Sequence, residues 1–173
     1  MPDVGKTWVA TQDGVIHAIA SGGLQAGTDL NPDSIKEVST MKVGRNPTSI
    51  VYKTMDYRTS ADQVWVLSRG DRRVDLLNVK TATIEKTLQD SRMVDPISMY
   101  DTRQNPGGTF VFTVVDYAGK QVLNYRYQPT DVHGGNTGTV TYGMGATGTD
   151  PFEFGGGYAV PGKPFQFTQS NVP

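Results

Sequence analysis

Two short patterns recur in alternation along the 173 residues, and this repetition is the feature that most restricts the fold. The first pattern is Asn or Asp followed by Pro, and its prolines are 49 and 55 residues apart: Asn46-Pro47, Asp95-Pro96 and Asp150-Pro151. The second is aromatic, any residue, apolar, hydroxyl, and it starts at Trp8, Trp65, Phe110 and Phe165. Such a regular alternation predicts a structural unit repeated about every 50 residues.

Composition indicates that the repeated unit is built from strands. The chain has 19 Val and 20 Thr against 7 Leu, together with 20 Gly and 10 Pro, which favours short strands and tight turns. Apolar residues alternate over 63–69 and 73–79, and 84–88 follows as a third strand. With the strand that each Pro begins, the unit has four strands, which is typical of a β-propeller blade. We therefore predict an all-β chain that forms a β-propeller of about three and a half four-stranded blades.

One stretch carries a family resemblance. Residues 65–78 open with Trp65-Val66-Leu67-Ser68, pass through a turn at Gly70, and continue as an alternating strand that contains Asp75. This order resembles the YVTN-type propeller repeat, and residues 43–50 are similar to the Val-Gly-x-x-Pro entry into the next blade of that family. The resemblance covers roughly residues 38–100, weakens over 101–128, and is lost over 129–149. It implies a propeller fold of the YVTN, amine-dehydrogenase heavy-chain and haem-d1 type, and implies no particular reaction.

The positions of the two patterns divide residues 1–173 into one propeller segment, with blade elements starting near 7, 63, 109 and 164. We expect second strands of blades near 7–12, 63–69, 109–115 and 164–169, and innermost strands starting at Pro47, Pro96 and Pro151. Trp65 and the aromatic residues that recur with it are expected to lie buried between blades. Three blades and an extra strand do not close the usual ring of about 4–8 blades. The ring is therefore expected to be partial, or completed by another chain.

Several classes of protein are disfavoured by charge and composition. The 16 basic and 17 acidic residues leave a net charge of −1, so no basic excess is available to bind nucleic acid. With no cysteine, the chain has no disulfide, thiolate metal site or Cys nucleophile. No apolar stretch approaches the roughly 20 residues of a membrane-spanning helix. We predict no metal and no cofactor.

Candidate ligand-facing residues lie in the predicted turns, because the turn after a blade's second strand and the entry to the next blade share one face of a propeller. The set is Arg45, Asn46, Arg69, Asp71, Arg72, Arg73, Asp95 and Asp150. Its arginines could meet an acidic ligand or partner, although a solvated turn is the simpler explanation for them. His17 and His133 have no evident partners, and residues 29–33 lack the Gly and Glu of a calcium loop, so structural roles are expected for them.

These observations favour a non-catalytic binding or scaffold module that presents its turns to a protein or small ligand. The alternative is part of a propeller enzyme or electron-transfer subunit, of quinoprotein-dehydrogenase, haem-d1 or lactonase-like type, whose reactive groups lie outside this chain. The expected partners are a further protein, additional blades or a second copy of the chain. The resemblance favours a periplasmic or extracellular location.

Overall fold

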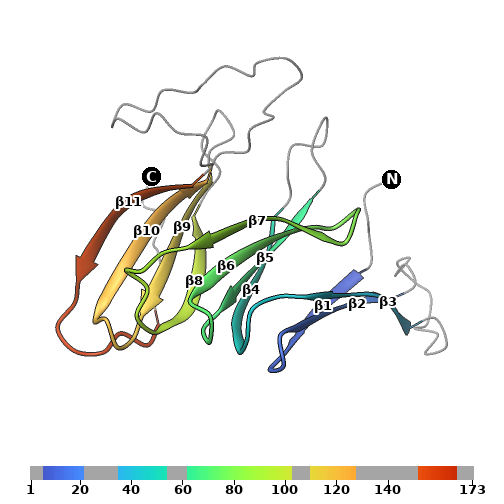
Figure 1. Ribbon diagram of the computed structural model, residues 1–173, viewed down its shortest axis with the longest axis horizontal. Coiled ribbons are helices and arrows are strands. Elements are labelled where there is room, and N and C mark those ends of the chain that lie inside the picture. Colours follow the sequence, from blue (N-terminus) through green and yellow to red (C-terminus); the bar gives the residue numbers. More distant parts are fainter. Residues whose placement is uncertain (1–5, 22–34, 54–61, 103–109, 128–151, 167–173) are drawn as a thin grey trace, which may run out of the picture.

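A computed structural model describes residues 6–21, 35–53, 62–102, 110–127 and 152–166 of the chain. Within these ranges the protein is all-β, with eleven strands and no helix, as the composition predicts. All strand pairs are antiparallel, and the strands form three separate sheets (Figure 1). No helix of this described part could cross a membrane.

Each sheet is a run of strands that are consecutive in the sequence. The first sheet has the order β1-β2-β3, with strands Lys6–Thr11, Val15–Ser21 and Ile35–Lys42. The middle sheet has the order β4-β5-β6-β7, with strands Pro47–Lys53, Gln63–Ser68, Arg73–Asn78 and Thr83–Gln89. The third sheet joins β8, β9, β10 and β11 in that order, with strands Pro96–Thr102, Phe110–Asp116, Gln121–Tyr127 and Phe152–Ala159.

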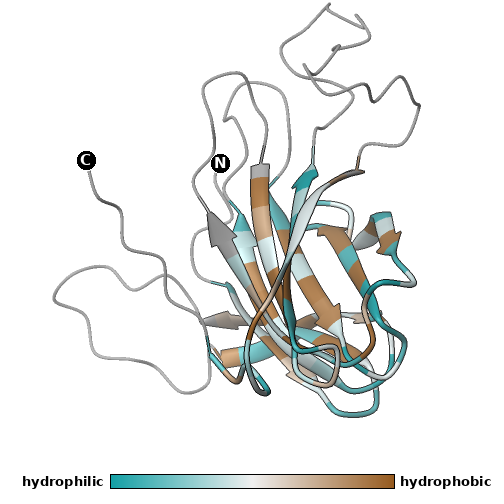
Figure 2. Ribbon diagram, turned by 90° about the vertical axis from the view of Figure 1, so that its left-hand side faces the viewer, coloured by the Kyte–Doolittle hydropathy of each residue, from teal (hydrophilic) through white to brown (hydrophobic). Residues whose placement is uncertain are grey.

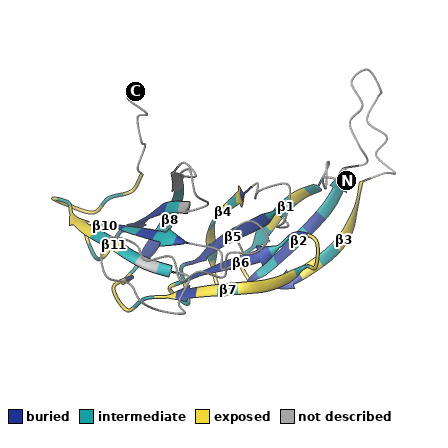
Figure 3. Ribbon diagram, turned by 90° about the horizontal axis from the view of Figure 1, so that it is seen from above, coloured by how far each residue is buried: buried dark blue, intermediate teal, exposed yellow. Residues whose placement is uncertain are grey.

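The middle sheet packs on both of its faces, so β5 is buried along its whole length (Figure 3). Alternate side chains of a strand point to opposite faces. Trp65 and Leu67 accordingly enter a cluster shared with the third sheet, whereas Val64 and Val66 enter a cluster shared with the first sheet. The outer strands β3 and β7 are largely exposed, and brown and teal segments alternate along the strands in Figure 2. The core thus lies in the two interfaces between sheets.

Strands are present at three of the four positions predicted for second strands, as β1, β5 and β9. β5 and β9 are second in their sheets, whereas β1 is the edge strand of its sheet among the described residues. Pro47 and Pro96 begin β4 and β8, as expected for a residue that has no N–H to give to a ladder. Trp65 is fully buried, and its ring meets Phe112 and Tyr127 of the third sheet edge-on, with centroids 5.3 and 5.5 Å away. The expected burial of Trp65 between two neighbouring layers is therefore confirmed.

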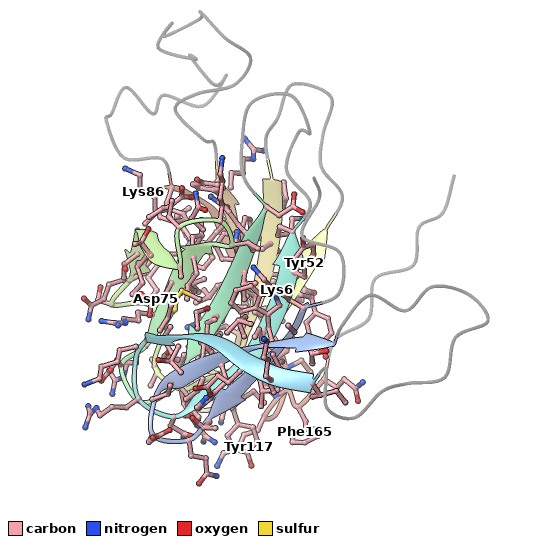
Figure 4. The ribbon with its side chains drawn as sticks, turned by 90° about the vertical axis from the view of Figure 1, so that its right-hand side faces the viewer. Lys6, Tyr52, Asp75, Lys86, Tyr117 and Phe165 are labelled. Atoms are coloured by element: carbon pink, nitrogen blue, oxygen red, sulfur yellow. The ribbon has the colours of Figure 1, made fainter. Side chains whose placement is uncertain are left out.

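The strand predicted over 164–169 is wrong where the structure describes it. Residues 164–166 belong to no strand, and Phe165 is 77% exposed at the periphery of the molecule (Figure 4). Gly162 has a φ of 90°, so the backbone leaves the extended conformation of β11 before it reaches these residues. Residues 167–169 lie outside the described ranges.

The third Asp-Pro element also has a different role from the one predicted. Pro151 lies outside the described residues, but the strand that follows it, β11, pairs with β10. It therefore completes the third sheet and does not start a new one. The sequence pattern is misleading here because a short apolar strand after Pro can pair at either edge of a sheet.

The aromatic pattern is also out of register in the third sheet. Trp65 lies three residues before Ser68, which forms the last β5–β6 pair before the turn. Phe110 lies six residues before Asp116, which holds the same place in β9. A shift of three residues reverses the face of a strand, so Phe110 is not the equivalent of Trp65. Trp8, three residues before Thr11, keeps the equivalence and lines the cluster between the first two sheets.

Candidate functional site

The candidate site is the end of the molecule where the described hairpin turns and sheet-to-sheet connections gather, here called the turn surface. It comprises residues 12–14, 43–46, 69–72, 90–95 and 117–120 and lies along the lower edge of Figure 1. Each connection between two sheets contacts the hairpin turn of a neighbouring sheet through backbone hydrogen bonds. Asn46 N donates to Gln12 O of the first sheet, and Tyr117 N donates to Asp95 O. The predicted proximity of the two kinds of loop is thus present.

Arg45 and Asp71 form one of the two salt bridges that join different turns of this surface. The backbone N and side-chain Nε of Arg45 each donate to the Asp71 carboxylate at 2.8 Å. Gly70 N donates in return to Arg45 O at 2.9 Å. The backbone N–H of Arg45 and then its guanidinium lower the pKa of Asp71. The Asp71 carboxylate therefore fixes the connection between the first two sheets against the β5–β6 turn.

Arg69 and Asp95 form the second salt bridge, between the middle and third sheets. Arg69 Nε and Nη2 donate to the two carboxylate oxygens of Asp95, at 2.5 and 2.9 Å. This bidentate geometry is the strong form of an Arg–carboxylate contact. Hydrogen bonding to Asp95 raises the pKa of Arg69. Two of the four predicted arginines, Arg45 and Arg69, are thus neutralised by carboxylates of the same surface.

Two buried aspartates behind the turns anchor the same connections. Asp75 is fully buried and accepts hydrogen bonds from Gly44 N, Arg73 Nε and Thr87 Oγ1. Asp116 is equally buried and accepts from the backbone N–H groups of Val94 and Asp95 at 2.9 and 2.8 Å. Buried carboxylates need such partners, because an unpaired charge in the interior is costly.

Sequence reasoning proposed no function for Asp75 or Asp116. The available signal is an acid at the centre or end of an otherwise apolar strand: Asp75 lies between Val74 and Leu76, and Asp116 follows Val114 and Val115. An acid in such a position must find donors inside the fold.

Two glycines allow the close approach of these turns. A Cβ atom on Gly44 would lie 2.5 Å from the Ser68 Cβ, and one on Gly70 would lie 2.8 Å from Arg45 O. Both positions are therefore closed to larger side chains unless the turns separate.

The remaining predicted residues differ in their roles. Arg73 is turned inward to Asp75, and Asn46 contributes through its backbone at a φ of 51°. Arg72 is exposed, with a φ of 54°, and forms no salt bridge among the described residues. Asp150 lies outside the described ranges. The turn surface thus keeps one uncompensated arginine, far fewer than a strongly basic patch would have.

A second polar group lies on the first sheet. His17 Nδ1 is hydrogen-bonded to Glu37 on β3, and His17 Nε2 lies 3.5 Å from Thr11 Oγ1 on β1. His133 and residues 29–33 lie outside the described ranges. Within those ranges, no group of three or more His, Cys, Asp or Glu side chains could hold a metal ion. The contacts of His17 agree with the structural role expected for it.

The comparisons with protein-family models and with curated proteins identify no relative. No protein-family model matches the sequence, and no curated protein matches it. The geometry of the sheets and turns is therefore the basis for a functional proposal.

Proposed function

We propose that the chain is a segment of a YVTN-like β-propeller and acts as a non-catalytic binding or scaffold module. In this proposal each sheet is one blade, and the turn surface is one face of the ring. The module recognises a protein partner or small ligand through that face.

The observation that carries this proposal is the repeated packing of one sheet upon the next. The three sheets follow each other in chain order, and the same alternation of side chains builds both interfaces. A buried aspartate also binds the backbone of each connection, although from different strands: Asp75 of β6 accepts from Gly44 N, and Asp116 at the end of β9 accepts from Asp95 N. Packing that repeats from one neighbour to the next is typical of repeat architectures.

Exposed apolar side chains on the outer sheets support the need for further blades or a second copy. Val9 and Val38 of the first sheet are 39% and 44% exposed. The equivalent of Val9 in the middle sheet is Val66, which is fully buried by its neighbour. Covering such surface contributes about 25 cal/mol per Å², which favours association.

The binding role of the turn surface rests on its rigidity and its chemistry. Salt bridges and backbone hydrogen bonds fix the turns, so little conformational entropy is lost when a partner binds. Arg72 and the exposed Val94 supply a charged and an apolar contact on neighbouring turns. We therefore expect a partner with a carboxylate next to an apolar group.

The first experiment is the solution mass of the purified chain, measured by light scattering after size exclusion at micromolar concentration. We expect a mass above 18.8 kDa, or a monomer that binds a hydrophobic dye. The variant Val9→Glu should reduce the mass or the dye binding, whereas Arg72→Glu, on the turn surface, should change neither. A cooperatively folded monomer of 18.8 kDa without dye binding would contradict the propeller proposal.

A further inference from the structure

The middle and third sheets each begin with a strand of the same design, here called the leading strand: β4 and β8. Each starts at the Pro of an Asn/Asp-Pro pair and has Ser two residues later: Ser49 and Ser98. Each also has a register irregularity between the Pro and that Ser. By register, Ile50 opposes Val66 in the middle sheet, as Met99 opposes Val114 in the third sheet. Ile50 and Met99 are therefore equivalent positions.

The two leading strands also contact each other. Ser49 Oγ donates to Met99 O at 3.2 Å, so the hydroxyl of one leading strand binds the carbonyl of the next. The Met99 side chain lies in the cluster between the middle and third sheets, against which Val51 of β4 packs, and is only 4% exposed. Ile50 is 36% exposed and its neighbour Tyr52 is 46% exposed, because the described residues place no leading strand before β4. The same position is thus covered in the third sheet and open in the middle sheet.

The first sheet has an open edge at the corresponding place. Among the described residues its order is β1-β2-β3, so β1 pairs on one side only. Gly14 N donates to Thr11 O, so the Thr11 carbonyl points toward β2. Because backbone groups of successive residues point to opposite edges of a strand, the N–H and C=O of Ala10 and of Trp8 face the open edge. The buried Trp8 Nε1 also has no hydrogen-bond partner in the described part of the molecule.

From this juxtaposition we infer that the open edge of β1 and the exposed side chains of β4 form an acceptor site for one added β-strand. The occupant is an extended segment of a partner polypeptide with the sequence Asn/Asp-Pro-x-Ser-apolar. The inference names a partner for the proposed scaffold, but it rests on sheet topology and does not require a closed ring.

The register of β4 and β8 defines how the added strand lies. Its Pro opposes Thr11, its Ser opposes Ala10, and the next residue opposes Val9, as in the pairs Ser98↔Val115 and Met99↔Val114. Its Ser hydroxyl donates to the Ile50 carbonyl, as Ser49 donates to Met99 O. Main-chain hydrogen bonds supply the affinity of such strand addition, and the side chains supply the specificity.

The probe is the β8 sequence Asp-Pro-Ile-Ser-Met-Tyr-Asp-Thr, fused ahead of Met1 through a three-residue Gly-Ser linker. The linker and residues 1–5 together give a connection about as long as the natural ones, since seven residues join β8 to β9 and nine join β4 to β5. Tethering raises the effective concentration of the strand, so a weak site is also filled. We expect the midpoint of thermal unfolding to rise by at least about 4 °C and hydrogen exchange at the Ala10 amide to slow at least tenfold.

Matched controls separate strand addition from a general effect of the fusion. A scrambled probe should leave both readouts unchanged. In the fused chain, Ile50→Asp should remove most of the gain. Ile84→Asp should not, although Ile84 is an isoleucine with similar exposure, 39%, on the opposite edge strand of the same sheet. Equal effects of the native and scrambled probes, or a gain that survives Ile50→Asp, would overturn the inference.

Discussion

Replacement of Trp65 by Ala is the most direct test of how the sheets are held together. The indole is fully buried and packs edge-on against Phe112 and Tyr127. Its Nε1 donates a hydrogen bond to Gln63 Oε1 at 2.9 Å. Each aromatic pair contributes about 0.5–1.5 kcal/mol beyond burial, and the hydrogen bond about 1 kcal/mol. With the cavity left behind, we expect Trp65→Ala to reduce the free energy of unfolding by about 3–5 kcal/mol.

The assay is equilibrium unfolding in urea, with the midpoint and slope fitted separately. Because a loss of this size approaches the whole stability of a small domain, Trp65→Phe serves as a second, milder variant. It keeps an aromatic ring but leaves Gln63 Oε1 without its donor, and it should cost about 1–2 kcal/mol. Trp8→Ala, at the equivalent but only partly buried position, should cost less than Trp65→Ala. A loss below about 1 kcal/mol for Trp65→Ala would refute the assignment of this residue to the interface.

Three further predictions concern the connections between sheets. Asp75→Ala should reduce the free energy of unfolding, measured by urea titration, by about 3–5 kcal/mol. The substitution removes the carboxylate that accepts from Arg73 Nε and leaves an unfilled space in its buried position. Gly44→Ala should cost about 1–3 kcal/mol in the same assay, since its Cβ would lie 2.5 Å from the Ser68 Cβ; an unchanged midpoint would contradict this. Burial alone would raise the pKa of Asp90, but the Arg92 backbone N–H and guanidinium and the Tyr125 hydroxyl lower it on balance. A lowered folded-state pKa means that the contribution of Asp90 is present above about pH 4 and is lost as the pH falls below it. Burial and Asp90 raise the pKa of Tyr125, so its contribution is lost above about pH 10. Melting curves across pH should show both losses in the wild type, a smaller acid loss in Asp90→Asn and a smaller alkaline loss in Tyr125→Phe.

The all-β class and most strands could be predicted from the sequence because they depend on local signals. Pro47 and Pro96 mark strand starts by their missing N–H, and alternation over 63–69 predicts β5. These signals act within a few residues and need no knowledge of the partner strand.

Register and strand partners could not be predicted in the same way. The pattern at Phe110 copies that at Trp65, yet β9 extends three residues further before its turn, which moves Phe110 to a different place in the ladder. Likewise, the aromatic pattern starts again at Phe165, yet residues 164–166 belong to no strand. Pairing is decided by contacts between distant segments, which a local pattern does not contain.

In the candidate site, too, the positions of the loops could be predicted from the sequence, but the contacts between them could not. The sequence predicted that Arg45 would lie near Arg69 on the β5–β6 turn, because loop positions follow from strand order. Their neutralisation by Asp71 and Asp95 depends on how two sheets pack, and only the structure shows it. An arginine cluster read from sequence alone therefore overstates the positive charge that a ligand would meet.

The paired charges of the turn surface are better understood as determinants of sheet alignment than as a ligand site in themselves. Apolar faces pack without strong directional preference, so the two clusters alone would tolerate sliding of one sheet over the next. The buried carboxylates of Asp75 and Asp116 accept hydrogen bonds from particular backbone N–H groups of the connections. Sliding by one residue would leave each carboxylate buried without those donors, at a cost of several kcal/mol. The turns are thereby fixed in one arrangement, and any partner of this surface must recognise its shape together with Arg72 and the exposed Val94 between the locked turns.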